Sequence, residues 1–347
     1  MEHIGATIYL TVAYLSIQQW FIPLLNILES IGTTSSSTTF SSSSSVTVLT
    51  TVSSLFTVSS YTLFLFYGLL PMIVFYVYGT ILGYIDLSST MTDWRNKYKV
   101  QYKINITPDD YIQGITISLR NWLFIGIPWA YYLCYTIIPS LIQNSPYYSL
   151  LHSSSSKDIH HPTLLPTLLS FFYQFSIFLI CEEILFYFSH RLLHTIPYLF
   201  RHIHLFHHTY SAPFGIAAIY AHPIEHLVSN VIPVASGSIV LHYLHLYILP
   251  TSYFYLLNGH IAITTIWVIA AILSTMTSHS GYCIPGMETP YFHDWHHEYG
   301  KENFGVLQIF DRLLHTDTKY RQLYKEGKLQ VPRNIENRKK EENGKHK

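Results

Sequence analysis

Long apolar stretches separated by short polar segments dominate the pattern along this chain. A helix needs about 20 apolar residues to cross the hydrocarbon of a bilayer, and several stretches reach or approach that length. Between the first two, segment 33–60 is rich in Ser and Thr, offers no core to pack and predicts a low-complexity linker. The pattern predicts an all-α polytopic membrane protein built on a transmembrane helical bundle. The expected spans are residues 4–28, 61–85, 115–142, 164–188, 231–249 and 254–276.

Polar positions around these spans predict their orientation. A basic segment, 95–103, follows the second span, and ten of the twenty Lys and Arg residues lie beyond Asp317. Because short cytoplasmic segments of membrane proteins carry an excess of Lys and Arg, we expect this loop and the C-terminal tail to be cytoplasmic. Only Glu2 and His3 precede the first span, which therefore lacks the positively charged start of a cleaved secretory signal. We expect this span to be retained.

The composition agrees with a membrane location. Only 12% of the 347 residues are charged and 49% are hydrophobic, whereas soluble domains average about 25% charged residues. The formal net charge is zero, so nothing in the charge balance indicates nucleic acid as a partner. The three Cys imply no disulfide framework.

Histidine is concentrated in the second half of the chain. Sixteen of the 21 His lie between residues 190 and 315, and three clusters have spacings of three or four residues. On a helix this spacing puts side chains on one face, about 5–6 Å apart at Cβ, so each cluster is expected to point its imidazoles the same way. Buried imidazoles are costly without a ligand, and one zinc takes only about four of them, so the clusters predict a two-metal site. They are His190 and His194, then His204, His207 and His208, then His293, His296 and His297.

The chemistry of such a site narrows the function. An even number of expected crossings separates the second cluster from the third, which predicts all three clusters on the cytoplasmic side, with substrate arriving from the membrane. Imidazole ligands favour zinc, iron, copper or nickel over magnesium or calcium, which prefer oxygen. Spacing does not choose among those four metals, but a site at a membrane face favours a lipid-modifying oxidase with two irons.

The rival function is that of a non-catalytic metal-binding membrane protein, such as a zinc carrier or a scaffold. A transporter would place ionisable ligands at mid-membrane depth, whereas these clusters are expected to follow the spans.

The sequence around these clusters resembles a known family. Three parts are similar, and in the same order, to the fatty acid hydroxylase superfamily, in particular its sterol C4-methyl oxidase and fatty acid hydroxylase domain-containing branch. They are HLFHHTYSAPFGIAAIYAHPIE at 204–225, the HSGY turn at 279–282, and segment 292–317 with FHDWHH, NFGVLQIFDRLL and HTD. The resemblance covers roughly residues 108–320. Two departures touch no expected ligand: Leu205 stands where the family usually has Lys, and Leu314 begins a Leu-His-Thr-Asp turn where Phe-Gly-Thr-Asp is usual.

The resemblance implies a ligand set. The three clusters match the family's metal-binding boxes, and His279 matches a further family histidine. His222 lies in a His-Pro-x-Glu turn, where it is either a ligand or a structural residue, with Glu225 orienting a neighbouring imidazole. His202 falls outside the box spacing and is expected to be an interfacial packing residue. The expected metal ligands are His190, His194, His204, His207, His208, His222, His279, His293, His296 and His297, with His207, His208, His296 and His297 expected to be catalytic.

The resemblance also implies an activity and partners. The implied enzyme is an iron-dependent sterol hydroxylase of the endoplasmic reticulum membrane that oxidises a C4 methyl group, with zinc as an alternative metal in purified protein. No Gly-rich flavin- or nicotinamide-binding motif occurs, so cytochrome b5 and its NAD(P)H-dependent reductase are the expected electron donors, and other sterol-synthesis enzymes are further expected partners. The same site would suit a fatty acyl or sphingolipid hydroxylase or a desaturase. The expected parts are N-terminal spans with the linker (1–107), a catalytic domain (108–320) and a basic cytoplasmic tail (321–347).

Overall fold

A computed structural model of the chain describes residues 64–137, 168–244, 247, 261–283 and 290–329. Within these ranges the regular elements are helices, and the one pairing of extended backbone is an isolated antiparallel bridge between Lys99 and Tyr282. The predicted all-α class is confirmed. The expected span 4–28, the Ser/Thr-rich linker and the tail beyond residue 329 lie outside the described residues.

Four helical stretches in the described ranges are long and apolar enough to cross a membrane. They correspond to four of the expected spans and indicate a multi-pass membrane protein. The π-helical and 3-10 segments are labelled η. The stretches are Leu65–Leu87, made of η2 (Leu65–Leu69) and α5 (Leu70–Leu87); Leu168–Thr195, which is α11; Pro223–Tyr243, made of α13 (Pro223–Glu225), η8 (His226–Val231) and α14 (Ile232–Tyr243); and Ile263–Ser280, within α16 (Ile261–Ser280).

The expected span 115–142 has a different outcome. It is helical as far as it is described, but it is not among the four candidate spans. This crossing, and the orientation argument that depends on it, therefore remain predictions. The helical segments there are α7 (Pro108–Asn121), η4 (Trp122–Gly126), α8 (Ile127–Tyr132) and η5 (Leu133–Ile137).

Two helices extend further than the pattern predicts. The fourth expected span ends at residue 188, yet α11 continues to Thr195, and α16 continues past residue 276 to Ser280. No Gly or Pro interrupts α11 before Pro197, where α12 (Pro197–His202) begins, so nothing in the sequence stops its helical hydrogen bonding. The first cluster therefore lies on the same helix as the fourth expected span, and its position relative to the membrane remains a prediction.

The chain divides into two compact units. The described residues of the first are 64–70, 128–137, 168–176, 238–244, 247 and 261–267, and this unit is held by apolar contacts such as Phe175 against Trp267, with ring centroids 5.2 Å apart. The second unit contains the described parts of Pro71–Ile127, Ile177–Gly237 and Val268–Lys347, including all three His clusters.

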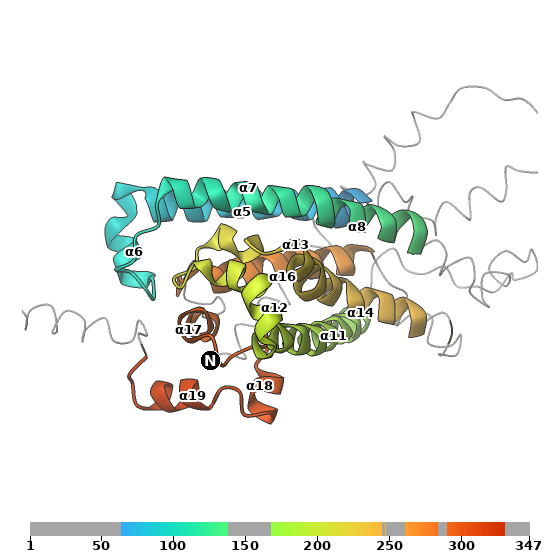
Figure 1. The fold of residues 1–347 in the computed structure, drawn as a ribbon. Helices are drawn as coiled ribbons and strands as arrows, with labels where there is room; N and C mark the ends of the chain where they lie inside the picture. Colours follow the sequence, from blue (N-terminus) through green and yellow to red (C-terminus); the bar gives the residue numbers. More distant parts are fainter. Residues whose placement is uncertain (1–63, 138–167, 245–246, 248–260, 284–289, 330–347) are drawn as a thin grey trace, which may run out of the picture. The chain divides into compact units, whose positions relative to one another are not determined.

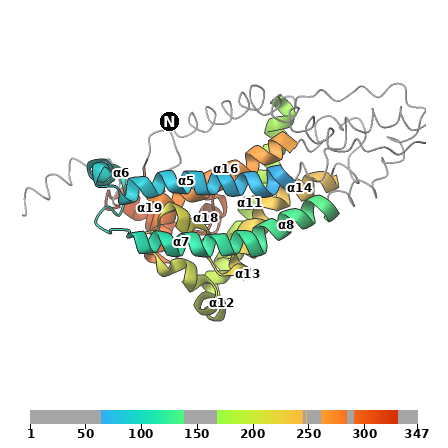
Figure 2. The same cartoon turned by 90° about the horizontal axis from the view of Figure 1, so that it is seen from above.

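Within the second unit, α5 and α7 lie side by side (Figures 1 and 2), joined by a hydrogen bond of 3.2 Å between the hydroxyls of Tyr76 and Ser118. The short 3-10 helix η7 (Gly215–Ile219) is buried against both. Glycine is needed at Gly79, since a Cβ there would lie 2.7 Å from Cγ1 of Ile216. This packing fixes the path of the chain on both sides of η7. The second His cluster lies on the preceding side.

A buried carboxylate ties the ends of these helices together. Asp86, at the end of α5, accepts hydrogen bonds from Lys99 Nζ at 2.5 Å, the Tyr282 hydroxyl at 2.6 Å and the Tyr111 hydroxyl at 2.7 Å. Tyr282 lies just after α16, three residues beyond His279. Because Asp86 and Lys99 are both buried, loss of either would leave an uncompensated charge, which costs about 3–5 kcal/mol.

Candidate metal centre

Four elements of the second unit bring nine His together. They are α11, the 3-10 helix η6 (His204–Thr209), the last turn of α16, and α17 (Tyr291–Tyr299). Their ring nitrogens form two groups, and within each group the ligand atoms all lie within 4.8 Å of one another. The first histidine group is His190, His194, His204, His208 and His296, and the second histidine group is His207, His279, His293 and His297.

Each HxxHH box is divided between the two groups. In the second box, His204 and His208 join the first group while His207 joins the second. In the last box the division is reversed, because His293 and His297 join the second group and His296 the first. In each box the first and last His, four residues apart, belong to the same group, and the His between them belongs to the other group. The expectation that each cluster points one way is therefore wrong for the two HxxHH boxes, and the two boxes together link the groups.

Backbone carbonyls orient the imidazole rings. Nδ1 of His190 lies 2.8 Å from the carbonyl oxygen of Phe304, and Nδ1 of His207 lies 3.2 Å from that of Tyr220. Since a carbonyl oxygen can only accept, Nδ1 carries the proton and donates, and the neutral ring keeps its lone pair on Nε2. The same arrangement holds for His279 with Thr275, His296 with Glu302, and His297 with Tyr210, at 2.7, 2.7 and 3.1 Å.

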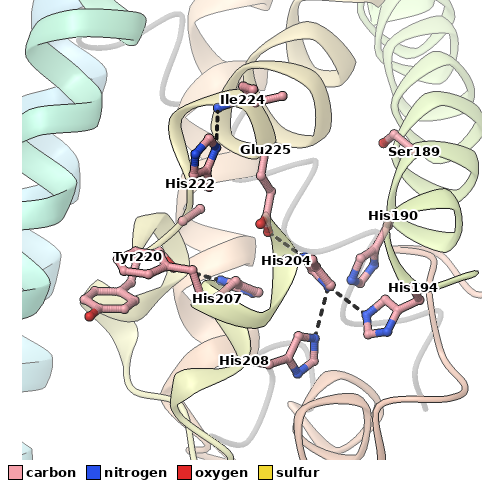
Figure 3. Close-up of polar contacts among 12 residues, drawn as sticks. Ser189, His190, His194, His204, His207, His208, Tyr220, His222, Ile224 and Glu225 are labelled. Carbon is pink, nitrogen blue, oxygen red and sulfur yellow. Dashed lines mark hydrogen bonds and ion pairs between the residues drawn. The ribbon is translucent and has the colours of Figure 1, made fainter. Parts of the chain in front are cut away.

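One ring is oriented by a carboxylate instead. His204 Nδ1 donates to Oε1 of Glu225 at 2.9 Å, while its Nε2 faces Nε2 of His194 and of His208 (Figure 3). Both His204 and Glu225 are buried. The interpretation that Glu225 orients a neighbouring imidazole is confirmed.

The facing nitrogens fit a metal ion. Nε2 of His207 and His279 are 3.2 Å apart although each ring already donates from Nδ1, so two lone pairs face each other with no proton between them. Six other Nε2 pairs within the groups are 2.7 to 3.2 Å apart. Two nitrogens bound at about 2.0–2.1 Å and at right angles would be about 2.9 Å apart. The donor set and its spacing are therefore those of a metal site.

Burial keeps these rings neutral. Desolvation lowers the pKa of His207 to about 4, and desolvation followed by neighbouring imidazoles lowers the pKa of His208 to about 2. The same two causes place the pKa values of His204, His293, His296 and His297 well below the usual value. Neutral imidazole is the form that ligates a metal, so the site is ready to bind at neutral pH.

Comparison with known proteins agrees with this geometry. A family model described as fatty acid hydroxylase matches residues 175–316, which includes all nine grouped His. The human fatty acid hydroxylase domain-containing protein 2 is 32% identical over 73% of this chain and 66% of its own length. The chain belongs to the fatty acid hydroxylase superfamily.

Other members of the superfamily are similar over shorter segments. A fatty acid hydroxylase of Mycosarcoma maydis is 29% identical over 68% of this chain and 53% of its own length. A C-4 methylsterol oxidase of Schizosaccharomyces pombe is 30% identical over 45% of this chain and 51% of its own length. The chain thus spans two thirds or less of the length of these relatives. No solved structure matches.

In this member of the superfamily, His222 lies outside both groups. Its Nδ1 accepts a hydrogen bond of 3.2 Å from the N–H of Ile224, so its side chain caps the start of α13 (Figure 3). Its extended backbone, with φ −62° and ψ 142°, precedes Pro223 at the first helical position. The structure therefore brings together nine of the ten predicted ligands and not His222. His202 is exposed and stacks on Tyr198 at 4.3 Å, also outside both groups.

Sequence reasoning missed two buried carboxylates. Glu183 on α11 accepts backbone N–H groups of the segment after α17, and Asp311 accepts those of Phe304 and Gly305 at 2.9 and 2.7 Å. They fix the carbonyl of Phe304, which orients His190. The sequence carries a signal for Glu183, since an acidic residue inside an apolar span is rare and is functional or paired.

Proposed function

We propose that this chain is a membrane-bound non-haem di-iron oxygenase that hydroxylates an apolar C–H bond of a sterol, at a C4 methyl group. One observation carries the proposal: two adjoining groups of buried and half-buried neutral imidazoles bring their ring nitrogens together in a member of a superfamily of oxidative enzymes. The first histidine group would hold one iron and the second histidine group the other.

Two bound irons would supply the activation of dioxygen that attack on an unactivated C–H bond requires. The chain's own residues would hold the ligands and keep water out. The backbone acceptors keep the proton of five rings on Nδ1, so that their Nε2 stays available. Phe304 is buried, and its ring centroid lies 5.2 Å from that of His194 and 5.7 Å from that of His296, so an aromatic wall replaces solvent on that side.

The four predicted catalytic histidines lie where the groups adjoin. The ring of His208 lies 4.9 Å from His296 and 4.7 Å from His297, and 5.7 Å from His207. His208 and His296 belong to the first group, whereas His207 and His297 belong to the second. If each group holds one iron, these four residues would hold the two ions on adjoining sides of the centre, which supports the predicted catalytic role.

A fatty acyl hydroxylase is the second candidate, favoured by the similarity to the Mycosarcoma maydis fatty acid hydroxylase. Either reaction needs an electron donor, for which we propose cytochrome b5 and its NAD(P)H-dependent reductase. The excess of Lys and Arg in the 95–103 loop and the tail supports placing the site and the C-terminus on the cytoplasmic side, in the endoplasmic reticulum membrane.

The test uses the full-length protein in lipid nanodiscs with cytochrome b5, its reductase and NAD(P)H. Metal content and oxidation of 4,4-dimethylsterol are measured by mass spectrometry, with acyl lipids as the competing substrate. We expect about two irons per chain and a hydroxymethyl sterol product. His207→Ala should abolish turnover, whereas His202→Ala, which removes an imidazole outside both groups, should retain it. Oxidation of acyl lipids alone would favour the second candidate, and bound metal without turnover of either substrate would refute the oxygenase.

A further inference from the structure

Segment 304–314, between α17 and α19 (Thr318–Lys325), exposes large apolar side chains. Four of them, including those of α18 (Ile309–Leu313), are between 39% and 66% exposed. Adjacent exposed apolar residues of this kind mark a contact with another apolar surface. They are Leu307, Ile309, Leu313 and Leu314.

The backbone before α18 is irregular, yet most of its amides have partners. Glu183 on α11 accepts the N–H groups of Val306 and Leu307 through Oε2 at 2.9 and 2.7 Å. Its Oε1 accepts those of Ile309 and Phe310 at 2.9 and 3.4 Å. Asp311 accepts the two amides just before, as described above. Two buried carboxylates therefore satisfy donors that water would satisfy in an ordinary surface loop.

The segment is also continuous with an apolar face of α11. Ile180, Ile184, Phe188 and Leu192 recur every fourth residue on this candidate span and are all exposed. The Phe310 ring lies 5.3 Å from that of Phe188, which places the segment beside this face. Glu183 lies 12 residues before the end of α11, or about 18 Å along the helix axis. The amides that Glu183 binds thus lie beside the middle of this candidate span.

We propose that residues 304–314 form a membrane-inserted segment, in addition to the four candidate spans, whose exposed side chains contact the acyl chains of the adjoining leaflet. Irregular backbone is excluded from hydrocarbon because unpaired N–H groups are costly there, and Glu183 and Asp311 remove that cost. The exposed Arg312, beside Leu313, has a long side chain that can reach the headgroups from such a position. The proposal rests on the membrane helices and is independent of the proposed reaction.

Depth-dependent quenching tests this directly. The full-length variant Leu313→Cys is labelled with an environment-sensitive fluorophore and reconstituted in nanodiscs containing lipids with spin-labelled acyl chains. Lys325→Cys, on an exposed position of α19, is the matched control. Wild-type protein labelled in parallel gives the background from Cys181, which is half-buried, and from the buried Cys134 and Cys283.

We expect the acyl-chain quencher to remove about half or more of the Leu313 signal, with little effect of aqueous iodide, because the probe would contact hydrocarbon. The Lys325 probe should respond in the opposite way. Quenching of the Leu313 probe by iodide would overturn the proposal. Protection from both quenchers would also overturn it, since another part of this chain or a partner would then cover the segment. Leu307→Cys, judged by the same criteria, provides the test if Leu313→Cys does not fold.

Discussion

Replacing Glu225 with Ala should weaken metal binding at one histidine group and leave the other intact. Glu225 provides the acceptor for Nδ1–H of His204, a ring in the first histidine group, and both side chains are almost fully buried. The second group takes its Nδ1 acceptors from backbone carbonyls of Tyr220, Thr275 and Tyr210, none of which this substitution touches.

The magnitude follows from the orphaned donor. A buried N–H without an acceptor costs about 1–3 kcal/mol. In the variant the His204 proton can move to Nε2, the nitrogen that faces His194 and His208, and this closes the lone pair that a metal needs. Removing such an orienting partner typically lowers metal affinity by about 10- to 100-fold. Glu225→Gln should lose much less, because its amide oxygen can still accept from Nδ1.

Equilibrium dialysis against a buffered iron series, with metal and protein counted by mass spectrometry, measures this effect. Glu225→Ala should show one tight and one weakened site, while Glu298→Gln, which changes an exposed carboxylate beside the last box, should match the wild type. Helical content by circular dichroism controls for misfolding. Equal loss from both groups would mean that Glu225 supports the fold as a whole, and unchanged affinity would refute the orienting role.

Other substitutions give sharp outcomes. His222→Ala should keep the full metal stoichiometry and lose about 1 kcal/mol of stability with the cap of α13, measured by metal analysis and chemical unfolding; loss of one metal would make His222 a ligand after all. Asp86→Asn should lower the free energy of unfolding by about 3–5 kcal/mol, because the charge of Lys99 is left buried without a partner. The double variant with Asp86→Asn and Lys99→Met should recover most of this loss. Additive losses would show that the two residues do not act as a pair. Glu183→Gln should speed hydrogen exchange of amides 306–310, read by mass spectrometry, because its NH₂ group cannot accept; unchanged exchange would mean that Glu183 does not hold the segment. Chelation of the metal should lower the melting temperature, with recovery on adding iron, because facing lone pairs then repel; an unchanged transition would argue against a metal in the native protein.

The spacing of the His boxes predicts the composition of the site but not its division. Nine of the ten predicted ligands come together, because spacings of three and four residues keep side chains near one face. That rule places His207 and His208 in one cluster. Adjacent residues on a helix differ by about 100° in direction, however, and the two rings join different groups. Which of the two groups each ring joins depends on α17, which follows η6 by more than 80 residues.

The partners of the ligands were less predictable still. Phe304 orients His190 through its carbonyl, which any residue would supply, so this orienting role leaves no mark in the residue type. The observed end of α11 differs from the predicted one for a related reason. Polar His190 and His194 look like the start of a loop, but burial against the other imidazoles removes the cost of keeping them on an apolar helix.

The carbonyl acceptors have a consequence for how this centre can change over time. Five of its rings take their orientation from the route of the main chain, at Phe304, Tyr220, Thr275, Glu302 and Tyr210, and not from the side chains there. Those side chains are therefore free to be replaced wherever packing allows, without loosening a ligand. Substitutions at these positions should therefore change the packing around the centre while the ring orientations are kept. Glu225 is the exception, since it orients His204 through its own side chain and a change there alters the ligand directly.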